Sequence, residues 1–337
     1  MTTATPRYDG LRLKKFDDAV FDDIDTLRSA IDDRIEHLLS GNSQSDSLAK
    51  AMRTSALSAG KRMRPLLVML VARDLGCASP ALIDVACSVE LVHAASLILD
   101  DLPCMDDASL RRGKPAIHIQ FGEDVAILAS VALLSRAFGV LSQAQDIPPV
   151  TRARLVATLA QTVGDQGLVR GQFEDLHGGA RSPEAIATTN ELKTGLLLGV
   201  AVDMAAIICH ADDGVAQQLR AFALAAGQAF QIKDDFLDGA GNDSAITGKD
   251  TGKDIGKATL INTLGVDEAQ RRLSACLAEA DRCLGAAVGG KGRTRHFMGA
   301  LFAKEAKGAR FIPELMAEPA KPRELRPSPQ LAELRLN

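Results

Sequence analysis

Hydrophobic residues recur along almost the whole chain with the spacing of an amphipathic helix rather than the alternation of a strand. Ala, Leu, Glu, Gln and Arg are frequent, and alternating runs of Val, Ile, Thr or Tyr are scarce. We therefore expect an all-α fold. Gly and Pro residues mark the ends of the predicted helices, which lie near residues 17–39, 46–58, 63–75, 80–101, 123–144, 150–176, 183–210, 213–238, 267–286 and 293–306.

The predicted helix over 183–210 is apolar around most of its circumference, which is typical of a central helix enclosed by others. Between residues 45 and 305 no stretch has the composition of an interdomain linker. We therefore predict one large helical bundle in a single domain over 1–307. Residues 239–259 are too rich in Gly, Asp and Lys to pack in its core. Residues 308–337 are charged and contain several prolines, which predicts a loosely attached tail.

Charge and composition exclude several classes of partner. The 337 residues include 39 Lys and Arg against 43 Asp and Glu, so no overall basic field exists for nucleic acid or an anionic membrane. The six cysteines form no Cys-x-x-Cys pair, and the N-terminal stretch lacks the apolar segment of a secretory signal. The longest apolar runs, Val125 to Ser135 and Leu196 to Ala211, are shorter than the roughly 20 residues that span a bilayer. We expect a cytoplasmic protein that is not an integral membrane protein.

Two acidic motifs, each following a long apolar helix, are the first candidates for chemistry. Asp234 and Asp238 are one turn apart on one helical face, which suits shared ligation of a divalent cation. Asp100 and Asp106 would point in different directions on a regular helix, but Pro103 interrupts the helix and permits a bulge that returns Asp106 toward Asp100. The motifs, LILDDLPCMD and FQIKDDFLD, together supply Asp100, Asp101, Asp106, Asp234, Asp235 and Asp238.

Clustered carboxylates at the end of an apolar helix are costly unless cations neutralise them. Mg²⁺ takes oxygen ligands and usually holds substrate phosphates as well. Either motif alone is equally compatible with a solvated helix end. The two motifs together, with the basic residues near them, favour a magnesium site for a phosphorylated substrate.

Short basic motifs supply the cations that a bound diphosphate requires. GKRMRP contributes three, and LRRGKP contributes two arginines, whose planar fork of donors suits phosphate oxygens. A lysine inside the apolar stretch LKTGLLLGVAV is costly to bury without a partner. Each basic motif alone is more often a solvated surface, and a lone His on an apolar helix is more often a core residue. The candidates are Lys61, Arg62, Arg64, His93, Arg111, Arg112, Lys193, Thr194, Lys249, Lys253 and Lys257.

From about residue 55 to 305 the chain resembles the trans-isoprenyl diphosphate synthases, because their motifs stand here in the same order. These motifs are GKRMRP, the first acidic motif with RRGKP, GQFEDL (171–176), KT (193–194), FQ (230–231), DDFLD and GKAT (256–259). HAASLILDDLPCMDDASLRRGKP and TGKDTGKDIGKATLINTLG are most similar to the bacterial geranylgeranyl diphosphate synthases of carotenoid and diterpenoid pathways. The resemblance implies the isoprenoid synthase fold, an all-α homodimer with a central active-site cavity in each subunit.

The resemblance also implies the roles of individual residues. Isopentenyl diphosphate would be held by Lys61, Arg64, His93 and Arg112. An allylic diphosphate would be held by Arg111, Lys193, Thr194, Gln231, Lys249 and Lys257. Asp100, Asp106 and Asp234, assisted by Asp101, Asp235 and Asp238, would anchor Mg²⁺. The residues on which catalysis would depend are Asp100, Asp101, Asp106, Lys193, Thr194, Gln231 and Asp234.

The implied reaction condenses isopentenyl diphosphate with dimethylallyl, geranyl or farnesyl diphosphate to give geranylgeranyl diphosphate, through ionisation of the allylic diphosphate, addition and proton loss. A farnesyl diphosphate synthase is the alternative. A class I terpene cyclase has no second prenyl diphosphate to bind, so GKRMRP and the paired arginines argue against it. Intact aspartates argue against a non-catalytic partner subunit. Two departures from the family pattern, Asp107-Ala108-Ser109 and Phe236, remove no required group.

Product length is predicted to depend on the helix that precedes the first acidic motif. Ala95 and Ser96 lie about one turn before Asp100, and one isoprene unit is roughly as long as a helical turn, about 5 Å. Small side chains there would leave the path of the growing chain open. The alternative is that Ala95 is only a close contact between helices.

Overall fold

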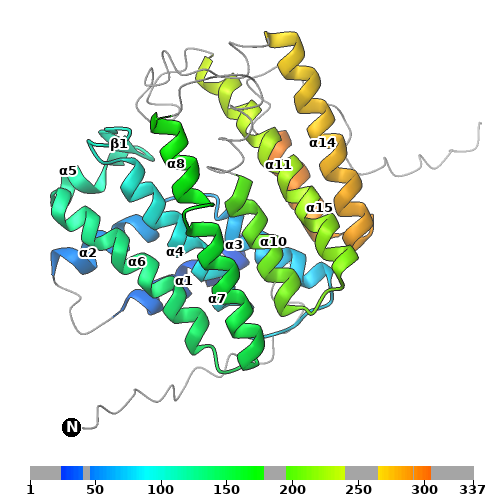
Figure 1. Cartoon of the computed structure of the whole chain (residues 1–337), viewed down its shortest axis with the longest axis horizontal. Coiled ribbons are helices and arrows are strands. Elements are labelled where there is room, and N and C mark those ends of the chain that lie inside the picture. The colour runs from blue at the N-terminus through cyan, green and yellow to red at the C-terminus, as the bar shows by residue number, and fades with distance from the viewer. Residues whose placement is uncertain (1–23, 41–45, 178–194, 240–264, 291, 305–337) are drawn as a thin grey trace, which may run out of the picture.

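The computed structural model describes residues 24–40, 46–177, 195–239, 265–290 and 292–304, without the side chains of 237–239 and 303–304. Nearly all of this part is helical, which confirms the predicted all-α fold (Figure 1). The helices are α1 (Ile24–Leu39), α2 (Ser47–Ala56), α3 (Met63–Asp74), α4 (Leu82–Asp100), α5 (Ile117–Phe121), α6 (Glu123–Gln143), α7 (Pro149–Val163), α8 (Leu168–His177), α10 (Leu196–Ile208), α11 (Asp213–Gly239), α14 (Val266–Val288) and α15 (Arg293–Lys304).

Most predicted helices agree with the structure to within a few residues, but the helix predicted over 150–176 is wrong. Two helices replace it, α7 and α8, separated by a turn that contains Gly164 and Gly167. Gly167 approaches the preceding turn so closely that a Cβ atom there would lie 2.0 Å from the Thr162 carbonyl oxygen. Glycine permits this approach, and the chain changes direction. Within the described ranges the sequence analysis also missed α5 and the short hairpin of β1 (Leu110–Arg111) and β2 (Lys114–Pro115).

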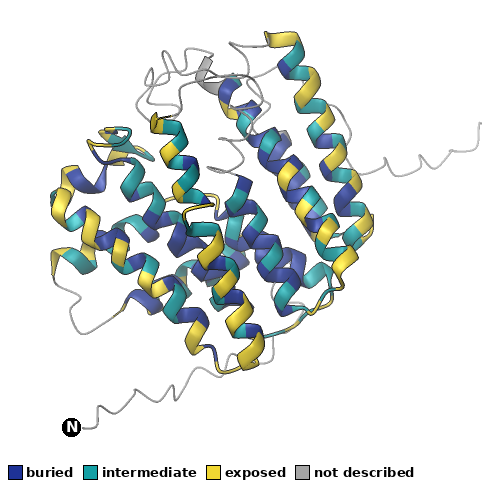
Figure 2. Ribbon diagram, in the orientation of Figure 1, coloured by how far each residue is buried: buried dark blue, intermediate teal, exposed yellow. Residues whose placement is uncertain are grey.

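The predicted central helix is confirmed for the described part of 183–210. α10 is apolar around its circumference because it contacts α3, α4, α7 and α11. Figure 2 shows the buried residues concentrated on these inner helices, while the outer faces of α6, α7 and α14 are exposed. One connected core contains residues from α1 through α15, so the described helices pack as one bundle.

In the part of the chain that the structure describes, two helices, α4 and α6, are long and apolar enough to cross a membrane by length and composition. The prediction from uninterrupted apolar runs did not identify them. In the most apolar window of α4, 72% is buried, so the apolar character of α4 is explained by the protein core. The corresponding share for α6 is 39%, because one face of α6 is exposed. The cytoplasmic location stays a prediction.

Several predicted features lie outside the described residues. They include most of the Gly-, Asp- and Lys-rich segment over 239–259, the tail over 308–337, and the first half of the helix predicted over 183–210. The domain boundary at residue 307 therefore stays a prediction.

The end of α3 also holds the start of α15, although the two helices are far apart in sequence. The Asp74 side chain accepts hydrogen bonds from the backbone N–H of Arg293 at 2.8 Å and of Thr294 at 2.9 Å. These N–H groups have no partner within their own helix, and a carboxylate at a helix N-terminus is also favoured by the helix dipole. Asp74 therefore caps α15 across the bundle.

We expect Asp74→Ala to lower the free energy of unfolding by about 1 kcal/mol, because two backbone donors in the first turn of α15 lose their acceptor. Urea unfolding monitored by circular dichroism measures this change. Asp74→Asn is the control, since its amide oxygen retains one acceptor and a smaller loss is expected. An unchanged unfolding midpoint for Asp74→Ala would contradict the capping role.

Candidate active site

The first acidic motif lies where α4 ends. Asp100 is the last residue of α4, and Asp101 is its C-cap. The chain then turns back, so that the N–H of Asp106 donates to the Asp100 carbonyl at 2.9 Å and the N–H of Ala108 donates to the Asp101 carbonyl at 3.2 Å. Asp107, in the same turn, has a left-handed backbone with φ +48°. The predicted bulge is therefore present, and it returns Asp106 to the end of the helix.

Asp101 is held by an ion pair with Arg111. The Asp101 side chain is 3% exposed, and the Arg111 Nε atom donates to its two carboxylate oxygens at 2.9 and 3.2 Å while Nη2 contacts Oδ1. Burial raises the pKa of the Asp101 carboxyl, and the Arg111 charge opposes that shift. The sequence analysis assigned Asp101 to a metal and Arg111 to the allylic diphosphate, and the structure brings these two residues together.

Arg111 and Arg112 reach different partners because a tight hairpin separates them. Leu110 pairs with Pro115 and Arg111 pairs with Lys114, which leaves Arg112 and Gly113 as a two-residue turn. Both turn residues have positive φ, +53° and +73°, as in a type I′ turn. The Arg-Gly pair between short strands was the sequence signal for this turn, and it was missed.

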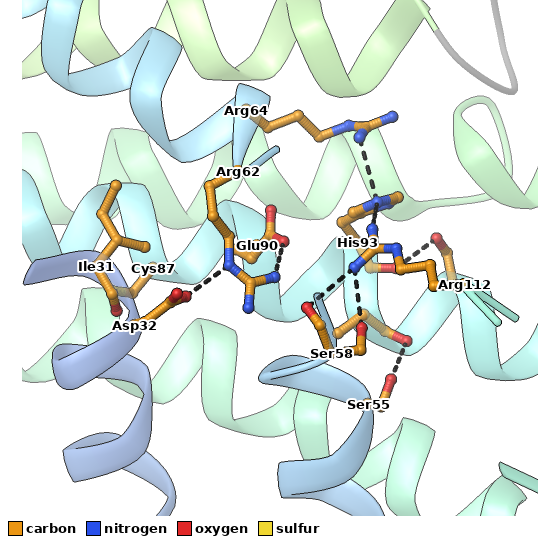
Figure 3. Close-up of polar contacts among 12 residues, drawn as sticks. Ile31, Asp32, Ser55, Ser58, Arg62, Arg64, Cys87, Glu90, His93 and Arg112 are labelled. Carbon is orange, nitrogen blue, oxygen red and sulfur yellow. Dashed lines mark hydrogen bonds and ion pairs between the residues drawn. The ribbon is translucent and has the colours of Figure 1, made fainter. Parts of the chain in front are cut away.

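Arg64, His93 and Arg112 converge from three elements, α3, α4 and the hairpin, and form what we call the His93 cluster (Figure 3). His93 Nε2 lies 3.2 Å from Arg64 Nη1 and 3.5 Å from Arg112 Nη2. Burial and the neighbouring arginine charges lower the pKa of His93 well below its usual range. His93 is therefore neutral at pH 7, and we infer that Nε2 accepts from the arginines while Nδ1 carries the proton.

The His93 cluster has unused hydrogen-bonding capacity. His93 Nδ1 and Arg64 Nε are buried and have no hydrogen-bond partner among the described residues. Buried polar atoms in native proteins almost always have a partner, so these atoms indicate a ligand. Two guanidinium groups and an imidazole N–H suit an anion with several oxygen atoms.

Lys61 and Arg62, which precede Arg64 in GKRMRP, differ sharply in exposure. Lys61 is exposed. Arg62 is buried and points away from the His93 cluster, toward Asp32 and Glu90 (Figure 3). Arg62 was a candidate diphosphate ligand in the sequence analysis, and this candidate role is wrong because both of its ionic contacts are to carboxylates of the protein.

The second acidic motif lies on the last turns of α11. Asp234 is exposed, whereas Asp235 is buried and accepts a hydrogen bond from Gln231 Nε2 at 3.1 Å. Burial lowers the pKa of Arg64, and the charges of Glu90 and Asp234 oppose the shift. Asp234 therefore lies within electrostatic range of Arg64 in the His93 cluster.

The predicted metal ligands are divided between two helix ends. Among the described residues no three His, Cys, Asp or Glu side chains form a ready-made metal site. Asp100 and Asp106 adjoin at the end of α4, and Asp234 lies on α11. The remaining predicted positions lie outside the described residues or have undescribed side chains: Lys193, Thr194, Asp238, Lys249, Lys253 and Lys257.

Ala95 and Ser96, the residues predicted to govern product length, have different surroundings. Ala95 is fully buried, and its carbonyl accepts a hydrogen bond at 3.0 Å from Ser130 of α6. Ser96 is half-buried and donates to the carbonyl of His93 at 2.9 Å. Ala95 therefore lies at the closely packed interface of α4 and α6.

A family model described as polyprenyl synthetase matches residues 45–287. The chain is 48% identical over 288 residues to the geranylgeranyl diphosphate synthase of Pantoea ananas, covering 84% of this chain and 94% of that protein. It is 39% identical over 247 residues to the farnesyl diphosphate synthase of Bacillus subtilis, covering 71% and 83% of the two chains.

Solved structures give the same result. A crystal structure of an FPP/GFPP synthase from Zymomonas mobilis matches with a TM-score of 0.72 and 31% identity, covering 82% of this chain and 97% of that chain. A geranyltransferase from Helicobacter pylori, complexed with magnesium and isoprenyl diphosphate, also matches with a TM-score of 0.72, at 28% identity, covering 83% and 97%. The motifs, the helical bundle and these similarities agree, and the chain belongs to the polyprenyl synthetase family of prenyltransferases.

Proposed function

We propose that this prenyltransferase adds isopentenyl diphosphate to an allylic diphosphate and releases geranylgeranyl diphosphate. The observation that carries the proposal is that His93 and Asp100 stand about two turns apart on α4, because two diphosphates need two separate sets of ligands. The product assignment is supported by relatives named geranylgeranyl diphosphate synthase, which are 48% identical to this chain.

The His93 cluster suits the diphosphate of the isopentenyl substrate. Arg64 and Arg112 supply guanidinium donors, and neutral His93 supplies its Nδ1–H without adding a third buried charge. The exposed Lys61 adds a cation just before the N-terminus of α3. A diphosphate bound there satisfies the buried donors that have no partner among the described residues.

The aspartate motifs suit the allylic diphosphate with Mg²⁺. Asp100, Asp106 and Asp234 offer carboxylate oxygens, which are the ligands that Mg²⁺ prefers, and their division between two helices leaves room for substrate oxygens between them. When bound, Mg²⁺ would neutralise charge on the departing diphosphate. Arg111, oriented by Asp101, supports the same region with a fixed positive charge.

The reaction forms a carbon–carbon bond between the two substrates. As the allylic carbon–oxygen bond breaks, its electron pair leaves with the diphosphate, and the isopentenyl double bond attacks the resulting cation. Loss of a proton from the adduct then restores a double bond, and the departed diphosphate is the proposed acceptor of that proton. Water would quench the cation, so apolar helices such as α4 and α10 suit this chemistry.

Two other activities fit less well. A farnesyl diphosphate synthase would use the same ligands, and relatives with that name are 39% and 41% identical to this chain, below the 48% of the geranylgeranyl diphosphate synthases. A terpene cyclase would have no isopentenyl diphosphate to place at the His93 cluster.

We also propose that the protein is a homodimer through the exposed face of α6. Ile127, Leu128 and Val131 are 44, 57 and 55% exposed, and Ile119 of neighbouring α5 is 58% exposed. Adjacent exposed apolar side chains mark interaction surfaces, and a self-complementary patch favours a two-fold dimer. A second copy would also account for the apolar character of α6.

Purified protein with Mg²⁺, isopentenyl diphosphate and an allylic primer should release geranylgeranyl diphosphate, and chelation of the metal should stop turnover. We expect Asp100→Asn and Asp234→Asn each to reduce kcat on the order of a thousandfold, because each removes several kcal/mol of transition-state stabilisation. Asp107→Asn is the matched control, since this exposed residue loses the same charge within the first motif. Chromatography of the hydrolysed products measures chain length. Equal activity in all three variants would contradict the metal assignment.

Ala95→Phe should shift the main product from geranylgeranyl to farnesyl diphosphate, because the growing chain, with its diphosphate held near Asp100, is proposed to extend along α4, and a ring about one turn before Asp100 would shorten that path. Ala94→Phe is the matched control, since it adds the same volume about 100° around the helix. Chromatography of the products at equal conversion compares the product chain lengths of the two variants. A folded, active Ala95→Phe enzyme that still releases mainly the longer product would refute the role of Ala95.

Leu128→Lys combined with Val131→Lys should convert the dimer to a monomer, because two desolvated ammonium groups are incompatible with an apolar interface. Light scattering after gel filtration measures the mass. Val150→Lys, at an exposed site on α7, controls for added charge. A wild-type monomer, or a double variant that stays dimeric, would contradict the assigned interface.

A further inference from the structure

Arg62 is a buried cation whose partners are both carboxylates of the protein. Its side chain is 2% exposed, its Nε atom donates to Asp32 Oδ1 of α1 at 2.6 Å, and Nη1 donates to Glu90 Oε1 of α4 at 2.9 Å (Figure 3). The Glu90 side chain is itself only 4% exposed. Charge-assisted hydrogen bonds of this length are strong and directional, so they fix the position of the guanidinium.

The Arg62 backbone is fixed at an unusual conformation. Arg62 is the N-cap of α3 and has a left-handed φ of +49°. A non-glycine residue adopts that conformation only when its surroundings stabilise it. The two ion pairs supply this stabilisation, and they therefore set the direction in which the chain enters α3. Lys61 precedes Arg62 and Arg64 follows it. The positions of both side chains therefore depend on the backbone conformation of Arg62.

Glu90 connects the same ion pair to His93. The two residues are three apart on α4 and therefore share one side of the helix. Burial lowers the pKa of Arg64 and of Arg112, and the Glu90 charge opposes the shift in both. Glu90 is thus a common counter-charge for the two guanidinium groups that contact His93, although neither is its hydrogen-bond partner.

The loop before Arg62 also positions Arg112. The Arg112 Nη1 atom donates to Ser58 Oγ at 2.9 Å, and a Cβ atom added to Gly60 would lie 2.8 Å from that same nitrogen. Ser58 therefore supplies a hydrogen bond, and Gly60 supplies the space that the guanidinium occupies. Residues 58–62, which we call the GK loop, thus contact or adjoin every cation of the His93 cluster.

We propose that Arg62, paired with Glu90, is a positioning residue that holds the GK loop and the His93 cluster in the geometry that binds the diphosphate of isopentenyl diphosphate. The proposal rests on the proposed function. Arg62 does not touch the substrate; it acts through Lys61, Arg64 and, by way of the loop, Arg112. Its loss consequently affects the affinity for one substrate and not for the other.

The decisive test separates positioning from general stability by replacing whole ion pairs. In Arg62→Met/Glu90→Met, apolar side chains of similar volume fill the space, and such replacements of a buried pair are often neutral for stability. The matched control is Arg34→Met/Asp84→Met, which removes a bidentate ion pair between α1 and α4 with hydrogen bonds of 2.7 and 3.1 Å. This pair contacts no member of the His93 cluster.

We expect the Arg62/Glu90 variant to raise KM for isopentenyl diphosphate about ten- to a hundredfold, as misplacement of binding groups by about 1 Å does. Its KM for the allylic substrate should change less than about threefold, and the control should change neither KM. Arg62→Lys, which keeps the charge but lacks the fork that reaches both carboxylates, should give an intermediate KM. Equal KM values in the Arg62/Glu90 variant and the control would overturn the proposal.

Calorimetric titration of the metal-free protein with isopentenyl diphosphate provides a readout that does not require turnover. Wild type that fails to bind it would contradict the proposed function. Wild type that binds, with an Arg62/Glu90 variant that binds equally well, would overturn the positioning role alone. If that variant does not fold, Gly60→Ala replaces it in the test. The added Cβ should displace the Arg112 guanidinium and weaken the binding of isopentenyl diphosphate about tenfold without unfolding the protein. Unchanged affinity would overturn the proposal.

Discussion

The cost of burying charge governs the arrangement of this active site, because a guanidinium or carboxylate removed from water must be paired. Two such pairs stand at helix ends: Arg62 with Glu90 at the start of α3, and Asp101 with Arg111 at the end of α4. Each fixes the backbone next to it, the first the entry into α3 and the second the hairpin. The remaining cations, Arg64 and Arg112, then converge on His93 without a direct carboxylate partner in the described part of the chain, and their positive charge suits an anionic substrate.

The sequence was sufficient for features that depend on local patterns. Helical periodicity predicted most helices, and the apolar circumference of the segment containing Leu196–Ile208 correctly predicted a central helix. The effect of Pro103 was also predictable, since a proline near a helix end disrupts the regular turn, and Asp106 does return to Asp100. These predictions succeeded because sterics and hydrogen bonding within a few residues determine the outcome.

Features that depend on distant contacts were not predictable. Arg62 and Arg64 are the same residue type two positions apart. Arg62 has a structural role because it pairs with Asp32 and Glu90, which belong to other helices. Arg111 and Arg112 are adjacent, and the left-handed turn at Arg112 sends them to different partners. The break between α7 and α8 depends on a close backbone contact at Gly167, which composition does not reveal.

The proposed position of both substrate subsites on α4 has a mechanical consequence. His93 and Asp100 belong to the same helix, and seven residues at the helical rise separate them by about 10 Å. Two diphosphates at closer range would repel strongly, whereas about 10 Å approaches the distance over which salt screens charge. A buried helix keeps this spacing constant, because its hydrogen bonds and its packing against α3, α6 and α10 resist extension. In the proposed function, α4 is therefore a rigid spacer that would hold the two diphosphates apart while the carbon atoms that react meet between them.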